Sequence, residues 1–300
     1  RIATSHYEEI LRQYPTNLRA QTALLKLSKQ QQGKSQGVLP DAVAGRIMKA
    51  LSSGLINEAA ELASKATQAY PQAFQGWLLR GVTFQAGGDF AQAERAFDKA
   101  ARLNPRCADS HYNRGLMQQH LKKLAEAQTS YELCLRVNPR MLDALNNLGV
   151  ILRDRRQPMQ ARVRWQQVLD IDPNHAEALI NLGNTCVDER DMEAAIGFYL
   201  RAVAAQPTHK LALANLCEAY EKSNLLEELE TLLLSLDADL VAQAPALGLQ
   251  RASLYFRKKD YAACCDQLKG IAVEREALEF RSKYYELMGK SREKLSDFGS

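Results

Sequence analysis

The sequence predicts an all-α fold in which helical hairpins repeat along the chain as an α-solenoid. Two observations lead to this prediction. Four kinds of residue recur at a fixed spacing of 34 residues, a length typical of one repeated helical hairpin. Within each period the apolar residues have helical spacing, as in the segment ALNNLGVILRD, and no stretch alternates with a period of two.

Each recurring position has a physical explanation. Glycine and alanine lack bulk and allow two helices to approach closely, a large apolar residue fills the space beside them, and proline ends the second helix because it has no N–H. The positions are Pro71, Pro105, Pro139, Pro173 and Pro207; Ala59, Ala93, Ala127, Ala161 and Ala195; Gly81, Gly115, Gly149 and Gly183; and Phe97, Tyr131, Trp165, Tyr199 and Leu233.

Numbered so that its proline is position 32, a repeat has glycine at position 8, alanine at 20 and an aromatic residue at 24. Repeats beginning at Phe74, Ala108, Leu142 and Ala176 contain all four. This combination resembles the tetratricopeptide repeat (TPR). The resemblance implies a TPR α-solenoid, a right-handed superhelix of antiparallel helix pairs. The positions used below follow this numbering.

The strength of the pattern varies along the chain. In order, we expect the second helix of a half TPR at 1–15, a helix plus linker at 16–39, a degenerate TPR at 40–73, four strong TPRs at 74–209, two degenerate TPRs at 210–278 and the first helix of a truncated repeat at 279–300. Half repeats at both ends predict that the chain is a piece of a longer protein. Because a solenoid is one continuous unit, we expect no separate globular domain.

Composition argues against several classes of function. The chain has 39 Lys and Arg against 35 Asp and Glu, a net charge of +4, and no run of like charges that would indicate nucleic acid or a membrane as partner. Of six cysteines, four occupy positions of small packing residues, so we expect no disulfide framework and no metal site. Free thiols favour a reducing compartment, and we expect a cytoplasmic protein. The four cysteines at positions of small packing residues are Cys134, Cys186, Cys217 and Cys264.

We expect neither a catalytic residue nor a cofactor in this segment, and therefore no enzyme. Cys107 and His111 are near each other in sequence, but no acidic partner accompanies them, and His111 falls at position 4, where a bulky packing residue is usual. His175 and His209 lie in the turns before first helices, where we expect them to be solvated.

Binding is the expected function, because in TPR arrays positions 2, 5, 6, 9, 12 and 13 of the first helices line a concave groove. Asparagine occupies position 6 four times. An amide both donates and accepts, so a row of amides can pair with the backbone of an extended peptide. The row resembles the asparagine ladder of O-linked N-acetylglucosamine transferases. The alternative is that these amides bond only within the array. They are Asn113, Asn147, Asn181 and Asn215.

Other groove positions and a second series refine this expectation. Positions 5 and 9 contribute Tyr112, Asn146 and Asn184, and position 2 contributes acidic residues. These groove residues lack the basic residues of a carboxylate clamp. The acidic residues favour basic or N–H groups in the ligand. At position 7, arginine recurs. These arginines either form an anion-binding site or pack their stems between helices and pair with acidic neighbours. The acidic residues at position 2 are Asp109, Asp143 and Glu177. The arginines at position 7 are Arg46, Arg80 and Arg114.

We therefore expect a scaffold that binds a protein or peptide in its concave groove. The alternative is a substrate-docking arm of a larger transferase, either a sulfotransferase or a glycosyltransferase, with its catalytic domain after residue 300. It is favoured by the closing segment YYELMGKSREKLSDFGS, which resembles the end of the TPR arm in bacterial TPR-sulfotransferases. The sequence makes no prediction about the oligomeric state.

Overall fold

The computed structural model describes residue 21, residues 37–271 and residues 278–297. Every regular element in these ranges is a helix, which confirms the predicted all-α class. The expected half repeat at 1–15 and most of the expected helix and linker at 16–39 lie outside the described residues. The contacts divide the chain after Ile171 into two units.

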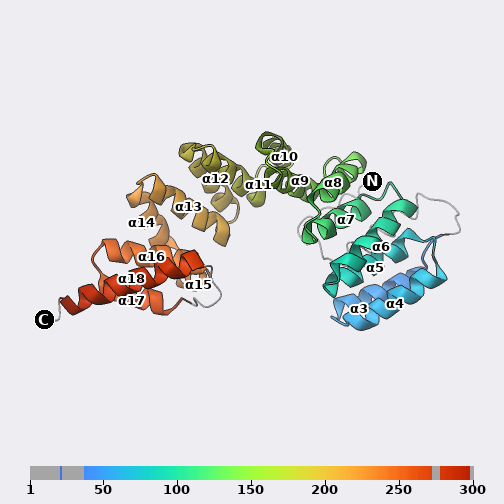
Figure 1. Ribbon diagram of the computed structural model, residues 1–300, viewed down its shortest axis with the longest axis horizontal. Coiled ribbons are helices and arrows are strands. Elements are labelled where there is room, and N and C mark those ends of the chain that lie inside the picture. Colours follow the sequence, from blue (N-terminus) through green and yellow to red (C-terminus); the bar gives the residue numbers. More distant parts are fainter. Residues whose placement is uncertain (1–20, 22–36, 272–277, 298–300) are drawn as a thin grey trace. The chain divides into compact units, whose positions relative to one another are not determined.

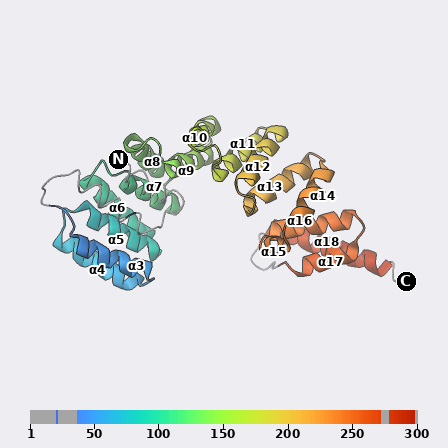
Figure 2. The ribbon, with the colours of Figure 1, turned by 180° about the vertical axis from the view of Figure 1, so that it is seen from behind.

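The first unit is a series of antiparallel hairpins in which each helix packs on its neighbours along the chain (Figures 1 and 2). Its second helices have 14 residues each. Proline starts the last of them, where its missing N–H costs nothing because the first turn has no partner for it. The helices are α3 (Asp41–Ser52), α4 (Ile56–Ala69), α5 (Phe74–Ala86), α6 (Phe90–Leu103), α7 (Ala108–His120), α8 (Leu124–Val137), α9 (Leu142–Asp154) and α10 (Pro158–Ile171).

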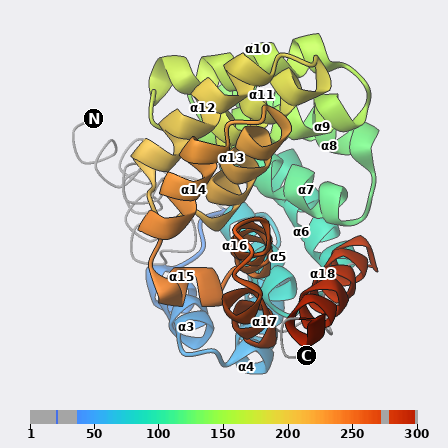
Figure 3. The same cartoon turned by 90° about the vertical axis from the view of Figure 1, so that its left-hand side faces the viewer.

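The second unit continues the hairpin pattern with one interruption. A short helix, α15, separates two hairpins, and it was not expected from the sequence. Asp237 begins it by accepting a hydrogen bond from the backbone N–H of Asp239. The last helix packs against α16 and α17 (Figure 3). The helices are α11 (Ala176–Asp188), α12 (Met192–Ala205), α13 (Lys210–Lys222), α14 (Leu226–Ser235), α15 (Ala238–Ala242), α16 (Pro245–Arg257), α17 (Tyr261–Lys269) and α18 (Leu278–Asp297).

The glycine at position 8 lies directly against the ring at position 24 of the same hairpin. A Cβ built on Gly183 would stand 2.4 Å from Cε1 of Tyr199, and one on Gly149 would stand 2.4 Å from Nε1 of Trp165. No real side chain tolerates such distances, so glycine is what allows these rings to be buried. Gly289 in α18 differs, because a Cβ there would have nothing within 4 Å.

The turn inside each hairpin follows one local plan. Position 15 has a left-handed backbone, with φ of +77° at Gly88 and +64° at Arg190. The next residue is the N-cap of the second helix. In three hairpins it is an aspartate whose carboxylate accepts a hydrogen bond from a backbone N–H of the first turn, whereas Leu55 at the same position has no side-chain acceptor.

The turn between hairpins uses ring nitrogens, which the sequence did not reveal. Trp77 donates from Nε1 to the carbonyl oxygen of Pro71 at 2.9 Å, and Nε2 of His111 lies 2.9 Å from the carbonyl oxygen of Pro105, which can only accept. His111 is therefore a packing residue that secures the turn. The expectation that His175 and His209 are solvated is wrong: both are half-buried, and each accepts at Nδ1 from a first-turn N–H as an N-cap.

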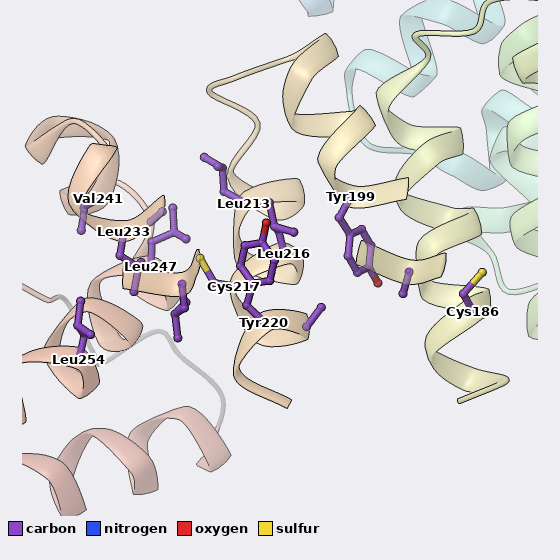
Figure 4. Packing of buried hydrophobic residues seen from close by; sticks show 14 residues of the cluster. Cys186, Tyr199, Leu213, Leu216, Cys217, Tyr220, Leu233, Val241, Leu247 and Leu254 are labelled. Carbon is purple, nitrogen blue, oxygen red and sulfur yellow. The ribbon is translucent and has the colours of Figure 1, made fainter. Parts of the chain in front are cut away.

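The second unit contains a continuous apolar core. The side chains lie between successive helices and include two cysteine thiols (Figure 4). Burial raises the pKa of the Cys217 thiol to about 12, so the thiol stays protonated and packs as an apolar group. The labelled residues are Cys186, Tyr199, Leu213, Leu216, Cys217, Tyr220, Leu233, Val241, Leu247 and Leu254.

Candidate functional site

The four asparagines at position 6 lie on the first helices of four hairpins, and all four are half-buried. Asn113 and Asn147 belong to α7 and α9 in the first unit. Asn181 and Asn215 belong to α11 and α13 in the second unit. Each unit therefore carries one pair, on helices that the repeat places at equivalent positions.

In the first unit, Asn147 contacts aromatic residues of the preceding hairpin. Its Nδ2 donates to the hydroxyl of Tyr112 at 3.3 Å, and the Tyr112 ring lies 5.9 Å from the Tyr131 ring. Burial raises the pKa of Tyr131, and the amide of Asn147 opposes that rise. The side-chain oxygen of Asn147 accepts no hydrogen bond from the described residues.

In the second unit, Asn215 takes part in a similar network. Its Nδ2 donates to Oδ1 of Asn184 at 2.9 Å, and the hydroxyl of Tyr199 donates to the same oxygen at 2.7 Å. These residues line an open pocket of about 180 Å³ formed by α11, α12 and α13. The side-chain oxygen of Asn215, like that of Asn147, has no donor among the described residues.

Asn113 differs from Asn147 and Asn215 because the hairpin before it has apolar Leu78 and Val82 at the positions where Tyr112 and Asn184 accept from those two amides. Its side chain forms no hydrogen bond with the described part of the chain. The internal bonding of a position-6 amide thus depends on whether the preceding hairpin offers a tyrosine or another polar partner.

The remaining groove candidates have different surroundings. Asn146 is 5% exposed, and its backbone oxygen accepts from Nε1 of Trp165 at 3.2 Å. The acidic residues at position 2 lie in the first turns of their helices, where a carboxylate also compensates the helix dipole. They are Asp109 in α7, Asp143 in α9 and Glu177 in α11.

Two of the three arginines at position 7 are engaged with neighbouring helices. Arg114 is paired with Asp98 at 3.0 Å and donates from Nε to Ser130, while its side chain is only 14% exposed. Arg80 donates to the hydroxyl of Thr67 at 3.1 Å and lies over the ring of Trp77. Arg46 is exposed on α3.

The cysteines are free thiols that pack among neighbouring side chains. All six are free, and five are buried. Burial raises the pKa of Cys134 to about 12 and of Cys107 to about 11. No group of three or more metal-binding side chains occurs in the described ranges.

Three charged residues of the pocket in the second unit were missed from the sequence. Asp188, Glu218 and Lys222 occupy positions 13, 9 and 13 of their repeats. Positions 9 and 13 are both expected groove positions, and this is the signal in the sequence that points to them. The pocket forms between two successive repeats, and the spacing within one repeat does not indicate which side chains of the two meet.

Comparison with known proteins agrees with the repeat pattern. The tetratricopeptide repeat model matches residues 80–134 and 146–210. A search of curated proteins by sequence finds no match. None of the described helices is both long and apolar enough to cross a membrane.

Solved structures show the same fold. A tetratricopeptide repeat protein from Parabacteroides merdae is 13% identical, with 84% of this chain and 98% of that one covered and a TM-score of 0.61. PilF of Pseudomonas aeruginosa is 19% identical, with 71% and 97% covered and a TM-score of 0.58. MamA of Desulfovibrio magneticus RS-1 is 19% identical, with 58% and 99% covered and a TM-score of 0.53. This chain is therefore an all-helical repeat protein in which residues 80–134 and 146–210 match the tetratricopeptide repeat.

Proposed function

We propose that this protein is an interaction scaffold that binds an extended peptide or a peptide-like segment of a partner protein along the first helices of its hairpins. TPR-type helical repeat proteins are often interaction scaffolds. The proposal is made for each unit by itself, with Asn113 and Asn147 as the amides of the first unit and Asn181 and Asn215 as those of the second.

The observation that supports the proposal is the unused hydrogen-bonding capacity of Asn113, Asn147 and Asn215. The side-chain oxygens of Asn147 and Asn215 are half-buried and have no donor in the described ranges, and the side chain of Asn113 forms no hydrogen bond within these ranges. The internal bonds of Asn147 and Asn215 use only the N–H side of the amide. They fix its orientation and leave the oxygen to accept from a backbone N–H of a peptide.

Recognition of this kind is directed at the peptide backbone. Backbone N–H groups are common to all sequences, so the amides would supply affinity, and selectivity would come from side-chain pockets next to them.

The free thiols of all six cysteines are typical of a reducing compartment and support the expected cytoplasmic location.

The test uses peptides that the wild-type protein selects from a random library displayed on phage. Dissociation constants of synthetic copies are then measured by calorimetry for wild type and for a variant with Asn113, Asn147, Asn181 and Asn215 changed to Ala. Each lost hydrogen bond is worth about 1 kcal/mol, so we expect affinity to fall by at least tenfold. The matched control is Asn174→Ala, an exposed asparagine in an inter-repeat turn. An unchanged dissociation constant in the four-alanine variant would refute the proposal.

Neither alternative from the sequence gains support from the described residues. Arg80 and Arg114 already bond to neighbouring helices, which leaves less of their capacity for an anionic ligand. The docking arm of a larger transferase stays a prediction, because it concerns residues after 300.

A further inference from the structure

The pocket of the second unit is lined by both apolar and polar side chains. Val187 on α11 and Met192 on α12 are partly buried and provide apolar lining, together with Ala219 of α13. The amides of Asn184 and Asn215, which belong to the proposed peptide-binding surface, line the same pocket. The pocket can therefore offer a long side chain both an apolar surface for its stem and polar groups for its end.

The hydrogen bonds already present determine what the pocket can still accept. Oδ1 of Asn184 receives two hydrogen bonds, from Tyr199 and Asn215, which uses both of its lone pairs. Oδ1 of Asn215 receives none from the described residues, and the N–H groups of Asn184 donate to none. The pocket therefore offers a ligand one amide acceptor and one amide donor, held in fixed orientations.

Two carboxylates and one ammonium group line the pocket and give it a net negative charge. Asp188 forms no ion pair with a described residue, whereas Glu218 is paired with Lys222 at 2.7 Å. Both carboxylates act on the pocket interior: burial raises the pKa of Tyr199, and the negative charges of Glu218 and Asp188 raise it further. The Glu218–Lys222 pair is about half exposed on both sides, so another cation can displace Lys222 at little cost.

The size of the pocket limits the kind of ligand. Sites for whole small molecules usually measure about 300–1,000 Å³. A volume of about 180 Å³ is too small for such a site and suits a single long side chain.

We infer that this pocket binds a basic side chain of the peptide, preferentially arginine, with the guanidinium between Asp188 and the side-chain oxygen of Asn215. That oxygen has two lone pairs, so it can accept from the guanidinium and from a backbone N–H of the peptide. Arginine fits better than lysine because its planar group carries five N–H donors and can bond a carboxylate through two parallel hydrogen bonds. Its methylene stem lies on Met192 and Val187, and the N–H groups of Asn184 are left for a carbonyl oxygen of the peptide backbone. The inference rests on the proposed function and names the class of residue that the second unit selects.

The test is an NMR titration of the full chain with acetyl-arginine-methylamide, following the side-chain amide signals of Asn184 and Asn215. Acetyl-citrulline-methylamide, which has nearly the same shape and no charge, is the matched ligand control. We expect saturable shifts with arginine and at least tenfold weaker binding with citrulline, because a hydrogen bond to a charged group is worth about 1.5–3 kcal/mol.

Three variants make the test specific. Asp188→Asn should weaken arginine binding about tenfold or more, for the same charge-assisted bonding reason. Lys222→Met should strengthen it, because it removes a positive charge from the pocket lining and leaves Glu218 uncompensated, and a variant that merely disturbed the fold would not. Glu227→Gln makes the same change of charge at an exposed residue of α14 and should have no effect. Equal binding of arginine and citrulline, or no effect of Asp188→Asn, would overturn the inference.

The outcome is separable from that of the proposed function. If phage-selected peptides lose affinity with the four asparagines changed to alanine but tolerate Asp188→Asn, the inference fails and the scaffold function stands. If acetyl-arginine-methylamide binds as expected while selected peptides ignore the alanine changes, the backbone-binding function fails and the pocket stands.

Discussion

At the scale of single residues, the same contact is made in each strong hairpin by a glycine and a ring. The glycine at position 8 has no Cβ, and the ring at position 24 occupies the volume that a Cβ would need. The ring is Phe97, Tyr131, Trp165 or Tyr199, so the contact tolerates different rings but not a larger residue in place of glycine. Glycine is retained here for space and not for backbone freedom, because none of these glycines has a positive φ.

Two alanine substitutions in one hairpin test this account. Gly183→Ala should lower the free energy of unfolding by about 1–3 kcal/mol, because its Cβ would overlap the Tyr199 ring. Gly197→Ala in α12 should raise it by up to about 1 kcal/mol, because a Cβ there meets nothing within 4 Å and alanine favours the helix. Urea unfolding followed by circular dichroism measures both. Equal effects of the two changes would contradict a steric role for Gly183.

At the scale of elements, the residue before each second helix decides how well that helix begins. Aspartate at position 16 accepts from the first-turn N–H groups in α6, α12 and α17. Leu55 occupies the same position before α4, with φ and ψ close to those of Asp89, and its side chain is 52% exposed. This helix therefore lacks a cap that its backbone geometry already allows.

Exchanging these residues should change stability in opposite directions. Leu55→Asp should stabilise the protein and Asp191→Ala should destabilise it, each by about 0.5–2 kcal/mol, which is the usual contribution of an N-cap. Thermal and urea unfolding of both variants provide the measurement, with Leu55→Asn as a second capping residue. A destabilised Leu55→Asp protein would mean that Leu55 makes a packing contribution larger than the cap.

At the scale of the whole molecule, contacts in each unit join helices that are close in sequence. Stability in such an array is a sum over hairpins and their interfaces, so a local defect should stay local. The buried thiols report this directly. Cys186 lies on α11, Cys217 on α13 and Cys134 on α8, and all three are fully buried.

Gly183→Ala should therefore speed iodoacetamide labelling of Cys186 most and of Cys217 next, and should leave Cys134 in the first unit unchanged. Labelling in the folded state is slow because burial raises the pKa of Cys134 and of Cys217 to about 12, so modification reports local opening. Mass spectrometry of the alkylated peptides gives all three rates in one sample. The same increase at all three cysteines would indicate all-or-none opening and contradict a modular array.

Much of the fold could be predicted from the sequence because its determinants are short-range and repeated. The spacing of glycine, ring and proline follows from contacts inside one hairpin, and 34 residues is the length of that hairpin. The short helix α15 was not predicted, because it departs from the repeat and depends on the single cap of Asp237. The capping by His175 and His209 was missed for a similar reason, since histidine is an uncommon N-cap.

The candidate site, like the fold, could be predicted from the sequence only in part. The sequence by itself determined the helical repeat, the position of Asn113, Asn147, Asn181 and Asn215 on first helices, and the packing role of the cysteines. Only the tertiary structure decided which amide atoms remain unbonded, that Asn146 is buried, and that Asp188, Glu218 and Lys222 meet at one pocket. A hydrogen bond or a pocket between neighbouring repeats depends on the side chains of both, and the spacing within one repeat contains no information about that pairing.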